Sequence, residues 1–277
     1  MKVVTWNVNG IRSRIFNDKT SAQIGKVKEI NVQEGSPMSQ ILDLNPDIIT
    51  LQETRCDSQQ GARFKIPGFK SFFNESKETE HRGPNRYSGT CLFISEKIEI
   101  EKIEYSIDGY DDTEGRIVIL HLNDSVLLGI YAPNSGTNYE KRIEFNEAIL
   151  KFLNSQTKKN VIFCGDLNMA KDTHFDKSKT KPGPCFYPHE LQQYDDLIKM
   201  GYIDTIKEDP IIYTWWDPRS KKIDGIACTR QANKGWRLDY FFTKGFNKVS
   251  SKVYKNIGET NPLSSDHAPV LLTIENI

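Results

Sequence analysis

Residues 161–168 read Val-Ile-Phe-Cys-Gly-Asp-Leu-Asn, a short apolar run with polar residues directly after it. A run of this length and composition, closed by a glycine, is typical of a buried β-strand. Similar runs recur at Val3–Val8, Ile48–Leu51, Cys91–Ile94, Ile117–Leu122, Val126–Tyr131, Leu238–Phe242 and Val270–Ile274. Helical apolar spacing appears over Tyr139–Gln156 and His189–Met200, and Gly201 is a plausible stop for the second helix. Strands that first alternate with helices and then cluster predict a layered α/β or α+β sandwich.

The length and charge of the chain limit the classes of function. The 277 residues carry no internal repeat and no Pro/Ser-rich linker, so we expect one domain over residues 1–277. Lysine and arginine together number 37, and so do aspartate and glutamate. This balance excludes a simple polycation that coats nucleic acid or anionic lipid, but it does not exclude a protein that binds nucleic acid through one basic face.

The cysteines and the absence of long apolar runs bear on location. Five scattered cysteines without a C-x-x-C pair argue against a disulfide framework or a thiolate zinc site. No signal-peptide pattern opens the chain, and no apolar run approaches the roughly 20 residues that span a bilayer. We therefore expect an intracellular protein, cytoplasmic or nuclear, with no membrane partner. Two polar stretches, Asn17–Met38 and Asp172–Pro188, are expected to be insertions or long surface loops.

Polar residues suited to metal and phosphate chemistry follow the apolar runs. They are Asn7, Asn9, Glu53, Tyr131, Asn134, Asp166, Asn168, Asp239, Asp266 and His267. Taken singly, a carboxylate after a strand is more often a cap or turn residue than a ligand. Asp239 is less easily explained that way, because it stands between Leu238 and Tyr240, and a buried carboxylate needs a partner. His267 is the candidate partner, and the pair would hold the imidazole in one tautomer.

As a set these residues are oxygen donors plus one histidine. Amide and carboxylate oxygens suit a hard cation, Mg²⁺ or Mn²⁺, rather than structural Zn²⁺. A hard cation together with an aspartate base and an aspartate-oriented histidine is suited to hydrolysing a phosphodiester.

Six motifs occur in an order that is recognisable. They are Thr-Trp-Asn-Val-Asn-Gly-Ile-Arg (residues 5–12), Leu-Gln-Glu-Thr-Arg-Cys (51–56), Tyr-Ala-Pro-Asn (131–134), Cys-Gly-Asp-Leu-Asn (164–168), Gly-Trp-Arg-Leu-Asp-Tyr (235–240) and Ser-Asp-His-Ala-Pro (265–269). The chain resembles the exonuclease III family of apurinic/apyrimidinic endonucleases, within the endonuclease/exonuclease/phosphatase superfamily. Glu-Gly-Arg-Ile (114–117) and Tyr-Thr-Trp-Trp (213–216) resemble the DNA-repair branch. The resemblance implies a four-layered α/β sandwich, in which two packed mixed β-sheets are flanked by helices.

The resemblance also implies roles for the residues after the strands. Glu53 would be the principal Mg²⁺ ligand, helped by Asn7 or Asn9 and by Asp266, and Mn²⁺ would substitute. Asp166 would deprotonate or orient the attacking water at the same metal site, with Asn168 beside it. His267, oriented by Asp239, would stabilise charge on the scissile phosphate. Tyr131 would hydrogen-bond that phosphate, with help from Asn134.

Further residues of the resemblance would bind the DNA. Trp215, Trp216 and Trp236 fall where the family lines its abasic-site pocket, and we expect Trp236 and at least one of the pair to line it. Arg219–Arg237 holds six basic residues and one acidic one, and Arg219, Lys221 and Arg237 are the expected DNA contacts. Lys177–Lys181 and His81–Arg86 are further candidates.

The implied partner is duplex DNA that contains abasic sites, and we expect a monomer. The implied activity is Mg²⁺-dependent cleavage 5′ to the abasic site, which leaves a 3′-hydroxyl, with some 3′-end trimming. Two alternatives stand: another superfamily activity (deadenylase, phosphoinositide phosphatase or sphingomyelinase), and a catalytically dead DNA-binding module. The departures from the family pattern are Asn9, where some members carry Asp, Cys91, where a glycine is usual, a longer Asn17–Met38 region, and an extension at Ile223–Gln231, which bears on substrate range.

Overall fold

The computed structural model of the protein describes residues 1–16, 28–77, 87–171, 183–207, 212–219, 222–223, 226–258 and 265–275, with no side chains described for 222–229. Within these ranges, no helix has the length and apolarity that crossing a lipid bilayer requires.

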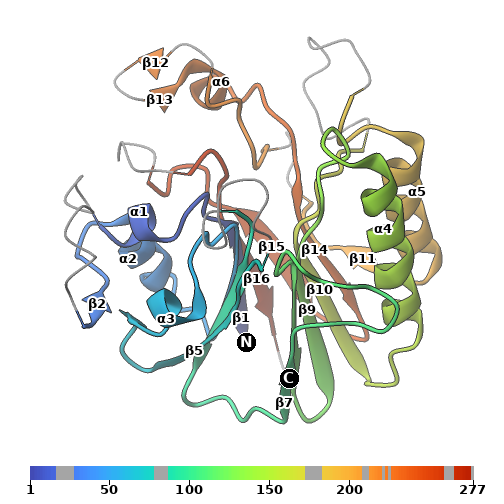
Figure 1. Ribbon diagram of the computed structural model, residues 1–277, viewed down its shortest axis with the longest axis horizontal. Helices are drawn as coiled ribbons and strands as arrows, with labels where there is room; N and C mark the ends of the chain where they lie inside the picture. The colour runs from blue at the N-terminus through green and yellow to red at the C-terminus, as the bar shows by residue number, and fades with distance from the viewer. Residues whose placement is uncertain are drawn as a thin grey trace.

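Two six-stranded β-sheets form the centre of the fold (Figure 1). The first has the order β15 (Val249–Val253), β16 (Val270–Ile274), β1 (Lys2–Asn7), β3 (Ile48–Gln52), β6 (Thr90–Ser95) and β5 (Phe69–Asn74). The second has the order β11 (Ile203–Asp204), β14 (Asp239–Lys244), β10 (Asn160–Asp166), β9 (Ser125–Tyr131), β8 (Ile117–His121) and β7 (Lys102–Glu104). β1 runs parallel to β3 and β9 runs parallel to β10, whereas the other neighbours are antiparallel. Both sheets are therefore mixed, as expected.

The remaining elements are short or lie outside the sheets. Two small two-stranded sheets pair β2 (Ile30–Asn31) with β4 (Phe64–Lys65) and β12 (Lys222–Ile223) with β13 (Ile226–Ala227). The helices are α1 (Arg12–Ile15), α2 (Pro37–Leu42), α3 (Ser58–Gly61), α4 (Tyr139–Asn154), α5 (Pro188–Lys199) and α6 (Cys228–Gln231). Figure 1 shows α1–α3 outside the first sheet, and α4 and α5 outside the second.

Three apolar cores hold these layers together. Because side chains alternate across a strand, Val3 of β1 packs between the two sheets while Val4 packs against α1 and α2. In β10, Ile162 likewise enters the core between the sheets, and Phe163 packs under α4 and α5. The order helix, sheet, sheet, helix confirms the four-layered α/β sandwich.

The long helix α4 illustrates how local sequence sets an element. Asn138 adopts an extended backbone, and its side chain accepts a hydrogen bond from the backbone N–H of Lys141 at 2.9 Å. Phe145, Ile149 and Leu153 recur at helical spacing and are buried against the second sheet. The prediction of a helix over Tyr139–Gln156 is confirmed to within two residues at its end.

The stretches expected to be insertions or long loops contain short elements. The described part of Asn17–Met38 holds the two-residue strand β2 and the start of α2, whereas 17–27 lie outside the described residues. The apparent extension at Ile223–Gln231 contains β13 and α6, drawn above the sheets in Figure 1. Residues 172–182 of the second expected loop lie outside the described residues.

A substitution at Gly165 tests the described path of β10. Its φ is +133°, and a Cβ built there would lie 1.9 Å from the carbonyl oxygen of Ile130 in β9. We expect Gly165→Ala to lower the free energy of unfolding by roughly 2–4 kcal/mol, because the backbone is strained for an L side chain and β9 must also shift. Urea unfolding measures the change.

Gly183→Ala is the matched control, because among the described residues no atom beyond the chain neighbours lies within 4 Å of a Cβ at that position. Equal stability of the Gly165→Ala variant and the wild type would contradict the described path of β10.

Candidate active site

The ends of several strands meet at one edge of the sandwich. β9 and β10 are parallel, so Tyr131 and Asp166 stand side by side where the two strands end. The antiparallel strand β14 begins there, and Asp239 is the register partner of Asp166. Three residues that the sequence analysis singled out are thus adjacent across three strands.

The side-chain amide of Asn7 joins the two sheets at this edge. Its Nδ2 donates to Glu53 Oε1 at 3.0 Å and to Asp166 Oδ2 at 2.9 Å. Asn7 ends β1, Glu53 follows β3, and Asp166 ends β10 of the second sheet. One amide therefore holds two carboxylates, from different sheets, at a single place.

Asp239 and His267 form the pair that the sequence analysis predicted. Asp239 Oδ2 lies 2.8 Å from His267 Nδ1, and both side chains are buried. Burial alone would lower the pKa of His267, but the charges of Asp239 and Asp166 raise it to about 10. His267 is therefore an imidazolium at neutral pH, and its Nε2 lies 3.7 Å from Asp166 Oδ2.

The surroundings of Asp166 raise the pKa of its carboxyl group. Burial and the nearby charge of Asp239 raise its pKa to about 7, against the opposing effects of His267, Asn7 and the backbone N–H of Asn168. The Asn168 N–H donates to Asp166 Oδ1 at 3.0 Å. A carboxylate with a pKa near neutrality is suited to exchanging a proton in the working pH range.

Asp266 is held as a carboxylate on the other side of His267. Asn9 Nδ2 donates to Asp266 Oδ1 at 2.8 Å, and Trp215 Nε1 donates to Oδ2 at 3.0 Å. Burial would raise the pKa of Asp266, but the charge of His267 and these two hydrogen bonds hold it below its ordinary value. Asn9 therefore supports a neighbouring acidic group.

Two overlapping groups of side chains are candidates to hold a cation. Ligand atoms of Asp166, Asp239 and His267 lie within 4.8 Å of one another. A ligating histidine must be deprotonated, however, and the raised pKa of His267 opposes this. The carboxylates of Glu53, Asp166 and Asp266 offer the oxygen donors that a hard divalent ion prefers. Asn7 donates through Nδ2 to the first two, and its Oδ1 accepts from the Asn9 N–H.

Three of the eight described non-glycine residues with positive φ lie at this edge. Asn9, Glu53 and Asn168 have φ values of 46°, 51° and 43°, which L residues adopt at a cost of about 1–3 kcal/mol each. The Asn9 N–H donates to Asn7 Oδ1 at 3.0 Å, which helps to hold one of these turns. Such outliers gather where a fold positions functional groups.

The Arg116 guanidinium packs against the Tyr131 ring and binds the Tyr131 carbonyl, a contact that was not predicted from sequence. Its guanidinium carbon lies 4.6 Å from the centre of the Tyr131 ring, and Nη1 donates to the Tyr131 carbonyl at 2.9 Å. Arg116 is buried and paired with Glu114 at 2.7 Å. Burial raises the pKa of Tyr131 well above its usual range, so the phenol remains a hydrogen-bond donor. The Glu114-Gly115-Arg116 motif was a signal, but its role as a support was not evident.

Asn134 and Asn168 form a weaker link beside Tyr131. Asn134 Nδ2 lies 3.5 Å from Asn168 Oδ1, and Asn168 Nδ2 donates to the Ala132 carbonyl at 2.8 Å. Both amides therefore lie along the same edge as Asp166.

Aromatic rings form a half-buried cluster beside Asp266. The ring centres of Trp215 and Trp236 are 5.0 Å apart, and Phe186 lies 4.8 Å from Trp236. Leu238 and Cys185 complete the apolar surroundings. Phe186 was not predicted, because it stands alone after a polar loop sequence.

Two of the expected DNA contacts need correction. Trp216 is only 1% exposed and packs in the core between the sheets, under the Arg230 guanidinium. Arg237 is also buried, paired with Asp204 and 4.6 Å from the Tyr240 ring centre. Burial of both side chains does not fit the expected surface contacts, and Trp215 is the member of the tryptophan pair that lies in the half-buried aromatic cluster.

The other expected basic contacts divide into two groups. Arg219 is exposed and bonds to Asp217 at 3.0 Å. Lys221, Lys177–Lys181 and His81–Arg86 lie outside the described residues.

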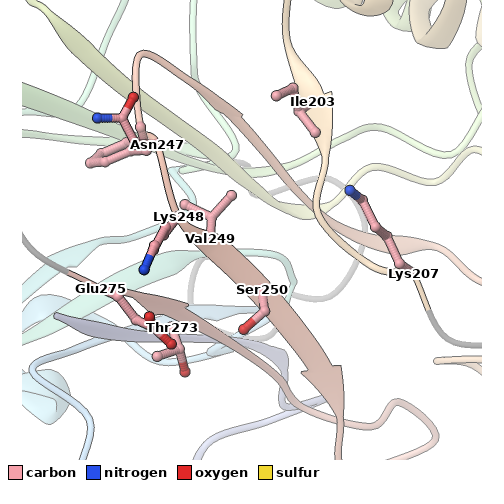
Figure 2. A pocket seen from close by; sticks show the side chains of 9 residues that line it. Ile203, Lys207, Asn247, Lys248, Val249, Ser250, Thr273 and Glu275 are labelled. Carbon is pink, nitrogen blue, oxygen red and sulfur yellow. The ribbon is translucent and has the colours of Figure 1, made fainter.

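A hollow elsewhere on the molecule is remote from these groups. Figure 2 shows Lys207, Lys248 and Glu275 around it, between the edge strands β11 and β15. β16 begins next to His267 and reaches Thr273, in the wall of this hollow, near its other end. The hollow is therefore at the opposite ends of the strands from the carboxylate cluster.

Known proteins are similar to the whole chain. Residues 4–267 match the Endonuclease/Exonuclease/phosphatase family. An exodeoxyribonuclease of Bacillus subtilis (strain 168) is 28% identical over 289 residues, with 99% of each chain covered. A DNA-(apurinic or apyrimidinic site) endonuclease of Dictyostelium discoideum is 26% identical, over 99% of this chain and 71% of that protein. The solved structure of an AP endonuclease from Archaeoglobus fulgidus has the same fold, with a TM-score of 0.72, 20% identity and all of both chains covered.

The raised pKa of Asp166 predicts a pH-dependent effect on stability. Its folded-state pKa of about 7 exceeds its ordinary value of 3.8, so wild-type stability is lost as pH rises between these values. Asp166→Asn removes this loss. We expect its stability relative to wild type to increase by roughly 1–3 kcal/mol between pH 5 and pH 8, measured by urea unfolding in EDTA.

Asp108→Asn, at an exposed aspartate, is the control and should show no such trend. A difference between Asp166→Asn and wild type that stays constant with pH would contradict the assigned pKa.

Proposed function

The chain belongs to the endonuclease/exonuclease/phosphatase family, and from this premise we propose that it is a DNA-repair nuclease. The proposed reaction is hydrolysis of the phosphodiester bond 5′ to an abasic site in duplex DNA, which leaves a 3′-hydroxyl. Trimming of 3′ ends, by exonuclease or phosphodiesterase action, would use the same site. The names of the relatives support a DNA substrate, since they include an exodeoxyribonuclease and an AP endonuclease.

One observation carries the proposal: the Asn7 amide holds Glu53 and Asp166 together, next to the imidazolium of His267. A scissile phosphate at this edge would meet a carboxylate able to accept a proton and a fixed positive charge. These are the groups that in-line attack of water on a phosphodiester requires.

We propose separate roles for Asp166 and His267. Asp166 orients the attacking water and accepts its proton as the new P–O bond forms, and Asn168 helps to hold Asp166 in place. The His267 imidazolium, fixed by Asp239, stabilises the negative charge that develops on the phosphate while the P–O3′ bond breaks. The departing O3′ takes up a proton from solvent, which gives the 3′-hydroxyl. Tyr131 and Asn134 donate hydrogen bonds to the same phosphate.

A divalent cation fits the oxygen donors at this edge. Glu53, Asp266 and the side chain of Asn7 would hold it, and Asp166 and Asn168 are the candidates for a second position. Asn9 positions the Asp266 carboxylate. The chemistry that Mg²⁺, or Mn²⁺ in its place, would supply there is neutralisation of phosphate charge and polarisation of the P–O bond.

The aromatic cluster would select the substrate. Trp215, Trp236 and Phe186 surround an apolar place beside Asp266. A sugar that lacks its base can rotate into such a place, whereas the base of an ordinary nucleotide blocks entry. Arg219 is the exposed described arginine that we retain as a phosphate contact.

We propose that residues 1–277 act as one catalytic domain and as a monomer. Support comes from the site itself, which takes Asn7 from one sheet and Asp166 from the other. We also keep the expectation of an intracellular location, cytoplasmic or nuclear. The described cysteines Cys56, Cys91, Cys164 and Cys185 are all buried and free, which suits a reducing compartment.

Incision of a defined substrate tests the proposed activity. A duplex with a single abasic-site analogue should be cut on the 5′ side of that site in Mg²⁺ and should stay intact in EDTA. Asp166→Asn should lower turnover by at least ~10²-fold, the usual scale for loss of a general base. Gel analysis of end-labelled strands measures both.

Exposed Asp108→Asn serves again as the control and should cut at the wild-type rate. No Mg²⁺-dependent incision by the wild type, or hydrolysis only of a lipid or poly(A) substrate, would overturn the proposed function.

Trp236→Ala tests the selection of abasic sites. We expect kcat/KM for the abasic duplex to fall by about tenfold or more, because a large apolar wall is lost. Binding of undamaged duplex, measured by fluorescence anisotropy, should change less than twofold. Trp236→Phe keeps an aromatic wall, so its kcat/KM for the abasic duplex should lie between those of the wild type and Trp236→Ala. Equal losses for both DNAs would instead assign Trp236 a purely structural role.

A further inference from the structure

Three aromatic rings meet where α4 and α5 begin. Tyr139 is the first residue of α4, and Tyr187 and His189 flank the first residue of α5. Ring centres lie 5.4 Å apart for Tyr139 and Tyr187, 4.5 Å for Tyr139 and His189, and 5.9 Å for Tyr187 and His189. We call these three residues the aromatic shelf. Tyr139 is 45% exposed, so the shelf presents a large ring to solvent.

Ring contacts and hydrogen bonds fix the residues of the shelf in place. Tyr139 meets the other two rings at interplanar angles of 78° and 76°, which is the edge-to-face geometry that aromatic pairs favour. His189 Nε2 lies 3.2 Å from Ser135 Oγ, and the Tyr187 N–H donates to Glu190 at 2.8 Å. A preorganised ring loses little freedom when a flat ligand stacks on it.

The shelf lies on the edge of the fold that carries the candidate active site. β9 ends at Tyr131 beside Asp166, and α4 starts eight residues later (Figure 1). Eight extended residues span at most about 27 Å, so the shelf lies no farther than that from the end of β9, which is about the length of eight base pairs of DNA. Ser135, which contacts His189, directly follows Asn134, a proposed phosphate contact.

The charges around the shelf indicate what would bind there. Glu140, next to Tyr139, is exposed, and Lys141 is paired with Glu114 at 2.8 Å. Burial lowers the pKa of His189, which disfavours the charged form of its ring. An uncharged aromatic surface beside an acidic side chain suits the face of a neutral ring and not a phosphate.

We propose that the aromatic shelf stacks against an unpaired nucleobase of the DNA strand that enters the active site. The proposal rests on the proposed function, which brings DNA to this edge. Bases inside a duplex already stack on both sides, so only a frayed, mismatched or overhanging base offers a free face. The shelf would thereby favour substrates with an unpaired base near the scissile bond, such as the strand ends that 3′ trimming needs.

Binding of 2-aminopurine DNA tests the shelf in EDTA, where no cleavage occurs. Wild-type protein should quench 2-aminopurine in a short single-stranded overhang, and Tyr139→Ala should weaken binding of that DNA by about fivefold or more, the scale of one lost base stack. Affinity for a blunt duplex should change less than twofold. Tyr139→Phe keeps the ring and should bind like wild type, and Tyr105→Ala removes an exposed tyrosine elsewhere as the matched control.

Equal affinity of wild type and Tyr139→Ala for the overhang DNA would overturn the proposal that the aromatic shelf stacks on a base. Tyr139-dependent self-association without DNA would overturn it as well. Unchanged circular dichroism and Tm show that the variants are folded. If Tyr139→Ala does not fold, normal overhang binding by a folded Tyr187→Ala, His189→Ala double variant would overturn the shelf instead. Abasic incision is assayed in parallel. Failure of incision with Tyr139-dependent binding overturns the proposed function alone, whereas incision with Tyr139-independent binding overturns the shelf alone.

Discussion

The hydrogen bonds of one amide, that of Asn7, join the two halves of this structure at their functional edge. Asn7 Nδ2 donates to Glu53 from the first sheet and to Asp166 from the second. Carboxylates repel one another when ionised, so a shared donor is needed to keep two of them close. The packing of the sheets fixes where Asn7 can reach, and so the core between the sheets determines the spacing of the acidic groups.

Burying charged groups at this edge costs folding free energy. Asp239 and His267 are buried as an ion pair, and Asp239 Oδ1 has no hydrogen-bond partner among the described residues. Asp166 is buried beside them with a pKa of about 7. Left-handed backbone at Asn9, Glu53 and Asn168 adds strain. Burial of the apolar cores offsets the unfavourable free energy of the buried charges and of the left-handed backbone. The left-handed residues named here lie where the fold presents its reactive groups.

Much of this could be predicted from sequence, for reasons that differ between residues. Buried strands such as β10 are continuous apolar runs, and the carboxylates directly after them necessarily reach the edge of a sheet. β15 was missed because this edge strand, Val-Ser-Ser-Lys-Val, has three consecutive polar residues and so no apolar run. Arg237 and Arg230 were counted as surface charge, because their burial depends on Asp204 and on the carbonyls of Lys255 and Ser265, distant partners that no local pattern reveals. Tyr139 and Tyr187 meet only through the packing of two helices.

A double-mutant cycle on Asn7 and Asp166 tests most directly whether the Asn7 amide unites the acidic groups into one reaction centre. The kcat for abasic-site incision is measured for Asn7→Ala, Asp166→Asn and the double variant. Because the two side chains act as a unit, the double variant should lose about as much activity as the more damaging single variant. Losses that multiply would show that Asn7 and Asp166 act independently, and would contradict the account.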